Sequence, residues 1–214
     1  MVKTDSPSGA TRRQQFSAST RRALLEVAHD LFVEQGYAAT SLDAVVAGAT
    51  VTKGALYHHF TGKQALFEAV FTAVEADAMR TITEAMKDEP DPWVKSQIGL
   101  RTFIEAVRTP AYRRIVIQEG PAVLGYERFR EHEEHSSYAV VESIVADVLA
   151  SVGVGAQHEV VTTFARVFFG GLQSAGEEVA TASDPEAAAS RVEAVVGMIL
   201  GGLQLLADRG ELRP

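Results

Sequence analysis

The stretch TVTKGALYHHF, residues 50–60, concentrates side chains that bind metal ions or donate hydrogen bonds, namely Lys53, Tyr57, His58 and His59. Such residues serve either a metal or catalytic cluster or contacts with a large, negatively charged partner. Adjacent residues on a helix point about 100° apart, so His58 and His59 are poorly placed to hold one ion together. The stretch therefore favours contacts with phosphate, with His58 exposed and His59 either packed or bound to phosphate.

A second candidate for chemistry is YERFREHEEHSS, residues 126–137, in which Glu131 and His135, or His132 and His135, share a helix face. Because no third ligand is evident, a solvated charged face explains this pattern better than a metal site does. The chain has no cysteine, no GxSxG motif, no phosphate-binding loop and no GxGxxG motif. We therefore expect no enzyme activity, no metal ion and no cofactor.

Charge divides the chain into two parts. The formal net charge of the 214 residues is −8, yet residues 1–63 hold seven Lys or Arg against five Asp or Glu, a net charge of +2. The remaining residues therefore carry −10, and only the first part suits a polyanionic partner. The sequence has no apolar signal segment and no run of about twenty apolar residues, so we expect a cytoplasmic protein without a membrane partner.

Apolar residues recur mostly at helical spacing, and no run alternates polar and apolar residues as strands do. We predict an all-α protein of about nine helices. The first helix ends just before Gly36, two short helices follow, of which Thr52 caps the second, and a long helix starts near Lys63. Breaks are predicted at Pro90 with Pro92, at Pro110 and at Gly120 with Pro121, and further helices at residues 123–151, 156–181 and 185–209.

Two short helices joined by AGATV, residues 47–51, are the parts of a helix-turn-helix, whose second helix enters the major groove of DNA. Small residues at the start of that helix let its backbone approach the bases, and a helix N-terminus attracts phosphate. Leu56 and Phe60 are expected to point into the core. Other side chains are expected to bind phosphates or base edges. The predicted DNA contacts are Thr40, Ser41, Thr52, Lys53, Gly54, Ala55, Tyr57, His58, His59 and Lys63.

The segment LFVEQGYAATSLDAVVAGATVTKGALYHHFTGKQALFEAV, residues 31–70, resembles the DNA-binding domain of the TetR (tetracycline repressor-like) family of bacterial transcription regulators. The phrase EGPAVLGYERFRE, residues 119–131, is similar to the C-terminal domains of some actinobacterial members. The resemblance implies a homodimer, a variable C-terminal ligand domain, and release of DNA when a small molecule binds. Thr50 stands where the family usually has Gly, which costs about 1 kcal/mol if the backbone there has a positive φ.

Aromatic and apolar residues after the predicted DNA-binding segment suit either a pocket for an apolar small molecule or an ordinary core. Both interpretations stay open for each residue. The candidate ligand-binding residues are Trp93, Phe103, Val107, Phe129, His132 and Tyr138.

Two apolar stripes near the end of the chain are wider than one pair of helices would hide. They contain the residues predicted for a dimer interface, which are Phe164, Phe168, Gly171, Leu172, Val195, Ile199 and Leu203. Gly-Gly pairs at 170–171 and 201–202 allow helices to approach closely, which suits a four-helix contact with a second copy. The alternative is that these helices bury only each other within one chain.

Together these patterns predict a disordered polar arm at residues 1–18, a helix-turn-helix domain at 19–63, and a ligand-binding and dimerisation domain at 64–214. We hypothesise a homodimeric repressor that a small molecule releases from a near-palindromic operator in double-stranded DNA. One alternative is a helical small-molecule carrier or enzyme with an appended DNA-binding head. Another is a ligand-independent activator.

Overall fold

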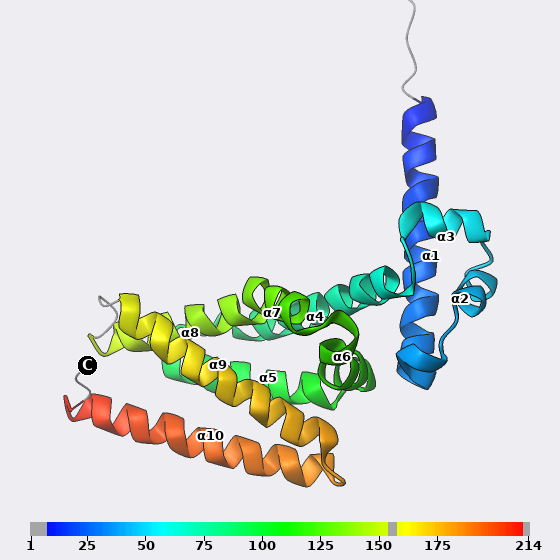
Figure 1. The fold of residues 1–214 in the computed structure, drawn as a ribbon. Helices are drawn as coiled ribbons and strands as arrows, with labels where there is room; N and C mark the ends of the chain where they lie inside the picture. The colour runs from blue at the N-terminus through cyan, green and yellow to red at the C-terminus, as the bar shows by residue number, and fades with distance from the viewer. Residues whose placement is uncertain (1–7, 154–157, 212–214) are drawn as a thin grey trace, which may run out of the picture. The chain divides into compact units, whose positions relative to one another are not determined.

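A computed structural model describes residues 8–153 and 158–211 of the chain, with side chains described from residue 14 onward. In these residues all regular structure is helical, with ten α-helices and one π-helical segment, which confirms the all-α prediction (Figure 1). The chain divides into two compact units between Phe71 and Thr72.

The first unit is a small helical bundle around a dense apolar core. It comprises α1 (Ser8–Ala39), α2 (Leu42–Gly48), α3 (Lys53–His59) and the start of α4 (Lys63–Met86). Its fully buried side chains include Leu24, Ala28, Phe32, Val45, Leu56, Leu66 and Phe67. The Phe67 ring meets the rings of Phe32 and Tyr37 edge-on, with centroids 5.2 and 5.3 Å away. These contacts hold the two short helices on a rigid base.

The first helix begins earlier than the sequence predicted, whereas its break lies close to the predicted end. Residues 8–18 are helical, whereas a disordered arm was predicted there; residues 1–7 lie outside the described part of the chain. The helical path breaks at Gly36, where φ is 80° and ψ is 172°, next to the predicted end. Glycine adopts a positive φ without steric cost, which explains why the chain turns at this residue.

The second unit is a layered helical body. Beyond α4 it contains α5 (Pro92–Arg108), a π-helical segment η1 (Tyr112–Glu119), α6 (Gly120–Leu124), α7 (Tyr126–His135), α8 (Ser137–Ser151), α9 (His158–Thr181) and α10 (Pro185–Asp208). Helix α9 packs against α8 and α10, and α5 contacts all three (Figure 1). Asp91 and Asp184 cap α5 and α10 by accepting hydrogen bonds from backbone N–H groups of their first turns.

Two helix boundaries predicted for the middle of this body are wrong. No break occurs at Gly120, which is helical (φ −49°, ψ −55°), because Pro121 lies in the first turn of α6, where its missing N–H needs no partner. The chain breaks instead at Gly125, where φ is 80°. The single helix predicted over 123–151 is instead the end of α6 followed by two helices, since Gly125 separates α6 from α7 and Ser136 (φ −121°, ψ −87°) separates α7 from α8.

Candidate functional site

Helices α2 and α3 have the caps and the turn that a helix-turn-helix needs. The Ser41 hydroxyl accepts a hydrogen bond from the Ala44 N–H at 3.1 Å, and the Thr52 hydroxyl accepts one from the Ala55 N–H at 3.2 Å. Between them Thr50 adopts a φ of 55°, the left-handed region in which a β-branched residue is strained. Both short helices therefore begin where the sequence predicted.

One side of α3 faces solvent and the other supports it. Leu56 is fully buried and Phe60 nearly so, as expected of residues that anchor the helix. Tyr57 is 52% exposed. The other exposed positions are Thr52, Lys53 and Gly54 at the start of the helix and His58 in its last turn. This face presents hydrogen-bond donors around a small glycine, so that the backbone can come close to a partner.

Lys53 is joined to α2 by an ion pair. Its ammonium lies 2.7 Å from a carboxylate oxygen of Asp43, and both side chains are largely exposed. The hydrogen bond and the charge of Asp43 raise the pKa of Lys53. Because exposed ion pairs contribute little stability, Lys53 can exchange Asp43 for a phosphate at small cost.

The two adjacent histidines have different surroundings. Their ring centroids are 5.1 Å apart and their planes meet at 70°, with His58 exposed and His59 partly buried. Partial burial, and then the charges of His58 and Arg21, lower the pKa of His59. No group of three or more His, Cys, Asp or Glu that suits a metal ion occurs among residues 8–153 and 158–211.

Two of the predicted phosphate contacts are engaged within the first unit. Lys63, at the start of α4, donates to the Ala38 carbonyl at 3.2 Å, and its ammonium lies 4.4 Å from the centre of the Tyr37 ring. Thr40 is only 2% exposed and its hydroxyl donates to the Gly36 carbonyl at 2.8 Å. Thr40 is therefore a structural residue and not a surface contact, whereas its neighbour Ser41 is exposed.

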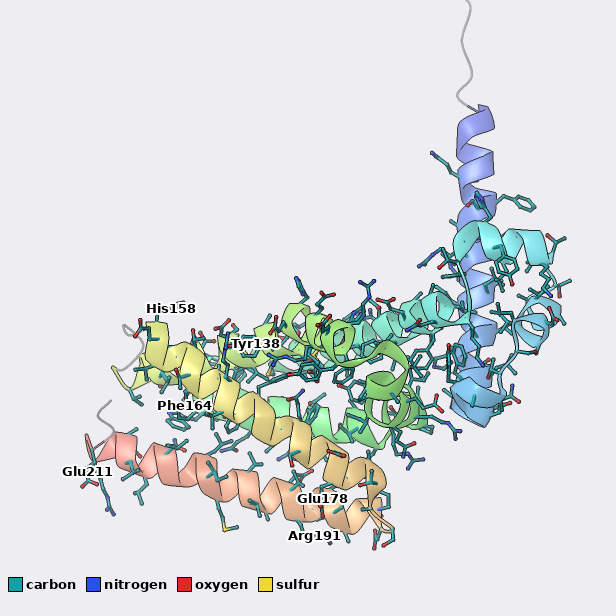
Figure 2. All side chains as sticks on the ribbon, viewed as in Figure 1. Tyr138, His158, Phe164, Glu178, Arg191 and Glu211 are labelled. Carbon is teal, nitrogen blue, oxygen red and sulfur yellow. The ribbon has the colours of Figure 1, made fainter. Side chains whose placement is uncertain are left out.

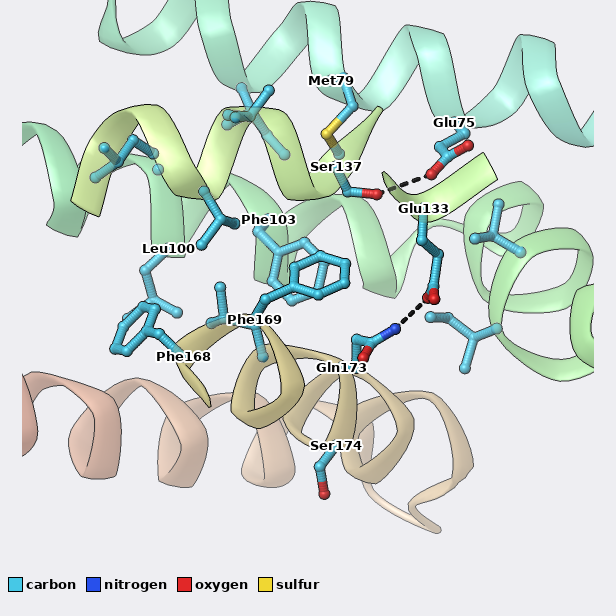
Figure 3. Close-up of a pocket in the computed structure, with 18 of the residues that line it drawn as sticks. Glu75, Met79, Leu100, Phe103, Glu133, Ser137, Phe168, Phe169, Gln173 and Ser174 are labelled. Atoms are coloured by element: carbon cyan, nitrogen blue, oxygen red, sulfur yellow. Dashed lines mark hydrogen bonds between the residues drawn. The ribbon is translucent and has the colours of Figure 1, made fainter. Parts of the chain in front are cut away.

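The second unit encloses a cavity of about 500 Å³, within the range of small-molecule sites. Residues of α4, α5, η1, α6, α7, α8 and α9 line it, and its walls are mostly apolar (Figure 3). Among the apolar side chains that line it are Met79, Ile82, Leu100, Phe103, Val116, Phe129, Val141, Ile144, Phe168, Phe169 and Leu172. A hollow of this kind in a helical body is suited to bind a small molecule.

Only Phe103 and Phe129 of the six predicted ligand residues line this cavity. Trp93 lines a smaller void of about 30 Å³ near α10, and Val107 is fully buried in the core. Tyr138 donates a hydrogen bond from its hydroxyl to Glu142 at 3.2 Å, and neither it nor His132 is among the lining residues. Apolar character alone did not separate the lining of the cavity from the core.

The polar residues of the cavity were missed by the sequence analysis. Glu75 is 2% exposed and accepts a hydrogen bond from the Ser137 hydroxyl at 2.8 Å, while Glu133 accepts one from the Gln173 amide (Figure 3). Burial raises the pKa of Glu75, and burial with the charge of Glu75 raises the pKa of Glu133 to about 7. A signal for Glu75 existed, because it lies on the buried stripe of α4, four residues after Phe71.

All seven residues predicted for a dimer interface line one groove between α9 and α10, of about 750 Å³. Large apolar side chains along these helices face solvent, with Val167 73%, Val195 51% and Ile199 50% exposed. The groove is bounded at one end by an ion pair between Arg191 and Glu178, at 3.6 Å (Figure 2). An added Cβ at either Gly171 or Gly201 would meet no atom within 4 Å, so this face is open in the single chain.

Helix α10 also corrects one expectation from the sequence. By length and composition alone it is apolar enough to cross a membrane, although no stretch of that kind was expected. Its exposed apolar side chains line one side of the groove, and residues of α9 line the other.

Comparisons with known proteins match both units. The family model for bacterial regulatory proteins of the tetR family matches residues 24–70, and the model for the tetracyclin repressor-like C-terminal domain matches residues 93–203. A crystal structure of a TetR-family transcriptional regulator from Pectobacterium atrosepticum is 30% identical, with a TM-score of 0.76 over 88% of this chain and 96% of that chain.

Two relatives of known sequence are similar over shorter regions. The transposon Tn10 TetC protein of Escherichia coli is 29% identical over 139 residues, which span 64% of this chain and 69% of that protein. The HTH-type transcriptional regulator AcrR of Shigella flexneri is 32% identical over 110 residues, about half of each chain (51% of both).

Proposed function

Because the chain belongs to the TetR family of bacterial regulatory proteins and is therefore a DNA-binding regulator of transcription, not an enzyme, we propose that it is a homodimeric repressor that a small molecule releases from its operator. The observation that carries the proposal is the exposed donor face of α3 above a buried Leu56, in a chain that also contains a ligand-sized cavity. Such a regulator acts where the chromosome is, so we assign it to the cytoplasm.

In the proposed complex each protomer places one α3 in the major groove. Two such helices related by a two-fold axis lie about 34–36 Å apart, one turn of DNA, which makes the operator near-palindromic. Lys53, Tyr57 and His58 would contact base edges or nearby phosphates, and Gly54 would let the backbone approach. Ser41 and Lys63, each at the start of a helix, would bind backbone phosphates, because helix N-termini and lysines attract them.

The groove between α9 and α10 would hold the second copy. Its exposed apolar side chains, Val195 and Ile199 among them, would be buried against their counterparts in a symmetric contact. Monomers of water-soluble proteins rarely leave so continuous an apolar face exposed, which supports this use.

Release would follow from the path of α4. This single helix begins at Lys63, beside the proposed DNA contacts, and its later residues Met79 and Ile82 line the cavity. A ligand that binds more tightly when α4 has the position of the DNA-free dimer biases the protein away from the DNA-bound spacing of its recognition helices. A coupling of about 1 to 3 kcal/mol lowers operator affinity some 5- to 150-fold, which is enough to switch transcription.

The DNA roles are tested by selecting bound duplexes from a random library and measuring affinities at two salt concentrations. Lys63→Ala should weaken all duplexes alike and reduce the slope of log affinity against log salt by about one, whereas Lys53→Ala or His58→Ala should change sequence preference. The matched control is Lys87→Ala, an exposed lysine of the second unit that pairs with Glu84. Failure of the unaltered protein to enrich any duplex would overturn the proposed operator.

The direction of regulation needs a separate measurement. A reporter gene placed behind the selected duplex should be expressed less when the protein is present, and should recover when α3 carries Lys53→Ala together with His58→Ala. Higher expression in the presence of the protein would make it an activator and contradict repression.

A further inference from the structure

The cavity combines apolar walls with two buried carboxyl groups. Glu75, on α4, is held by the Ser137 hydroxyl, and Glu133, on α7, by the Gln173 amide. Figure 3 shows both at one end of the cavity, away from Phe168 and Leu100 at the other end. The hollow is thus divided into a small acidic end and a larger apolar one.

No basic side chain in the lining balances these carboxyl groups. Among the described residues that line the cavity none is Lys, Arg or His, and a third carboxylate, that of Glu177, also lines it. Arg130 lowers the pKa of Glu133, but it donates its hydrogen bonds to Tyr126 and Glu134, at 3.1 and 3.0 Å. The charge of His132 lowers the pKa of Glu75 from outside the lining.

An ionised carboxylate in such surroundings is costly unless a cation accompanies it. Burial is the main cause of the raised pKa of Glu75 and of Glu133, about 7 for the latter, and a cation inside the cavity would offset that cost. An anionic ligand would add a further negative charge and is disfavoured. A neutral apolar ligand would leave both carboxyl groups as they are.

The apolar end suits the rest of a cationic molecule. The rings of Phe103, Phe168 and Phe169 line the cavity, and aromatic faces attract organic cations as well as hydrocarbon. Its volume of about 500 Å³ accommodates a molecule of drug size.

We infer that the cavity binds an organic amine whose ammonium group lies between Glu75 and Glu133 and whose apolar body packs against Phe103, Phe168 and Phe169. This inference rests on the proposed function, in which the same cavity holds the effector, and it gives that effector a positive charge. Donation of N–H bonds to both carboxylates distinguishes such a ligand from a purely apolar one.

The test compares three probes with one hydrocarbon body, namely phenylbutylamine, phenylbutanol and phenylbutyrate. Their binding to the full-length protein is measured by calorimetry at a pH of about 8, where Glu133 is mostly ionised and the amine is charged. The amine should bind at least about tenfold more tightly than the alcohol, and the carboxylate most weakly of the three. Equal or tighter binding of the alcohol or the carboxylate, or no binding of the amine at millimolar concentration, would overturn the inference.

A matched pair of variants locates the site. Glu133→Gln keeps the size of the side chain and removes its charge, so the preference for amine over alcohol should fall about tenfold. Glu127→Gln, an exposed position in the first turn of the same helix, makes the same charge change and should leave the preference intact. An unchanged preference in a folded Glu133→Gln protein contradicts the assignment. If that variant does not fold, the ranking of the three probes on the unaltered protein still decides.

The selected operator duplex separates this inference from the proposed function. Amine binding that releases the duplex supports both. Amine binding without release supports the cavity assignment and contradicts the proposed release mechanism. Operator binding by a protein that ignores the amine leaves the regulator intact and overturns the inference.

Discussion

The two units of this chain place their functional groups in opposite ways. The first is packed solid around Phe32 and Phe67 and keeps Lys53, Tyr57 and His58 on its surface. The second encloses a cavity, leaves a groove open, and keeps the polar side chain of Glu75 inside. A helix that recognises DNA must hold its side chains in fixed positions, whereas a body that responds to a ligand needs space and polar groups that are not fully satisfied.

Helix α9 connects the two hollows of the second unit. Phe168 and Leu172 line both the cavity and the groove, so a ligand on one side and a second copy on the other would touch the same side chains. Packed helices shift between discrete arrangements and do not deform continuously. In the proposed dimer, a ligand in the cavity would therefore contact side chains that also line the groove.

The largest effect is expected from a charge placed in the groove. Ile199→Arg would bury an unpaired guanidinium in the dimer contact, raising the dimer dissociation constant by more than about a hundredfold. Because Ile199 is 50% exposed in the single chain, the monomer should stay folded. Sedimentation velocity and circular dichroism measure the two properties, and operator affinity should fall with dimerisation.

The matched control for this variant is Ala139→Arg, at an exposed position on α8 outside the groove. It should leave both the dimer and operator binding unchanged. If Ile199→Arg remains dimeric while Ala139→Arg dissociates, the second copy is bound elsewhere and the groove needs another occupant.

A smaller effect is expected from the acidic end of the cavity, as a dependence of stability on pH. A carboxyl whose pKa rises from 4.5 to about 7 on folding takes up a proton, so its contribution falls as pH increases between these values. Glu133→Gln has no carboxyl to ionise, so it avoids this loss of stability at high pH. It should therefore raise the free energy of unfolding at a pH of about 8. Glu133 is only partly buried, so solvent screening reduces the gain to about 1 to 2 kcal/mol.

Denaturant titrations at several pH values measure this gain. It should vanish only below the unfolded pKa of 4.5, where the folded and the unfolded protein both hold the proton on Glu133. The groups that surround Glu133 are Glu75, Arg130, Glu134 and Gln173, and the Gln substitution leaves all of them in place. If Glu133→Gln raises the free energy of unfolding equally at both ends of the pH range, the gain comes from packing and not from the ionisation of Glu133.

The contrast between the units also explains what the sequence could predict. The caps Ser41 and Thr52 directly precede two short helices, and the buried Leu56 and the exposed Tyr57 lie within the second, so local spacing was sufficient to place them. Thr40 was misplaced because a hydroxyl beside a helix start has the same pattern whether it faces solvent or, as here, donates inward to Gly36.

The cavity could not be predicted in this way because seven elements contribute to its wall. Trp93 and Val107 resemble Phe103 in sequence, yet only Phe103 lines the cavity, since what separates them is the packing of distant helices. All seven residues predicted for the dimer interface line the groove, because they lie on two long helices with apolar stripes, where spacing again decides which side chains share a face.

The smallest effect is expected in the first unit, at the turn before α3. Thr50 holds a φ of 55°, which costs a β-branched residue about 1 to 2 kcal/mol, and Gly adopts it freely but loses more backbone entropy on folding. Thr50→Gly should therefore raise the free energy of unfolding by about 1 kcal/mol or slightly less, measured by denaturant titration. Thr50→Ala, which keeps a Cβ at the same φ, should gain less than Gly. A less stable Gly variant would mean that the Thr50 side chain stabilises the turn by more than its backbone strain costs.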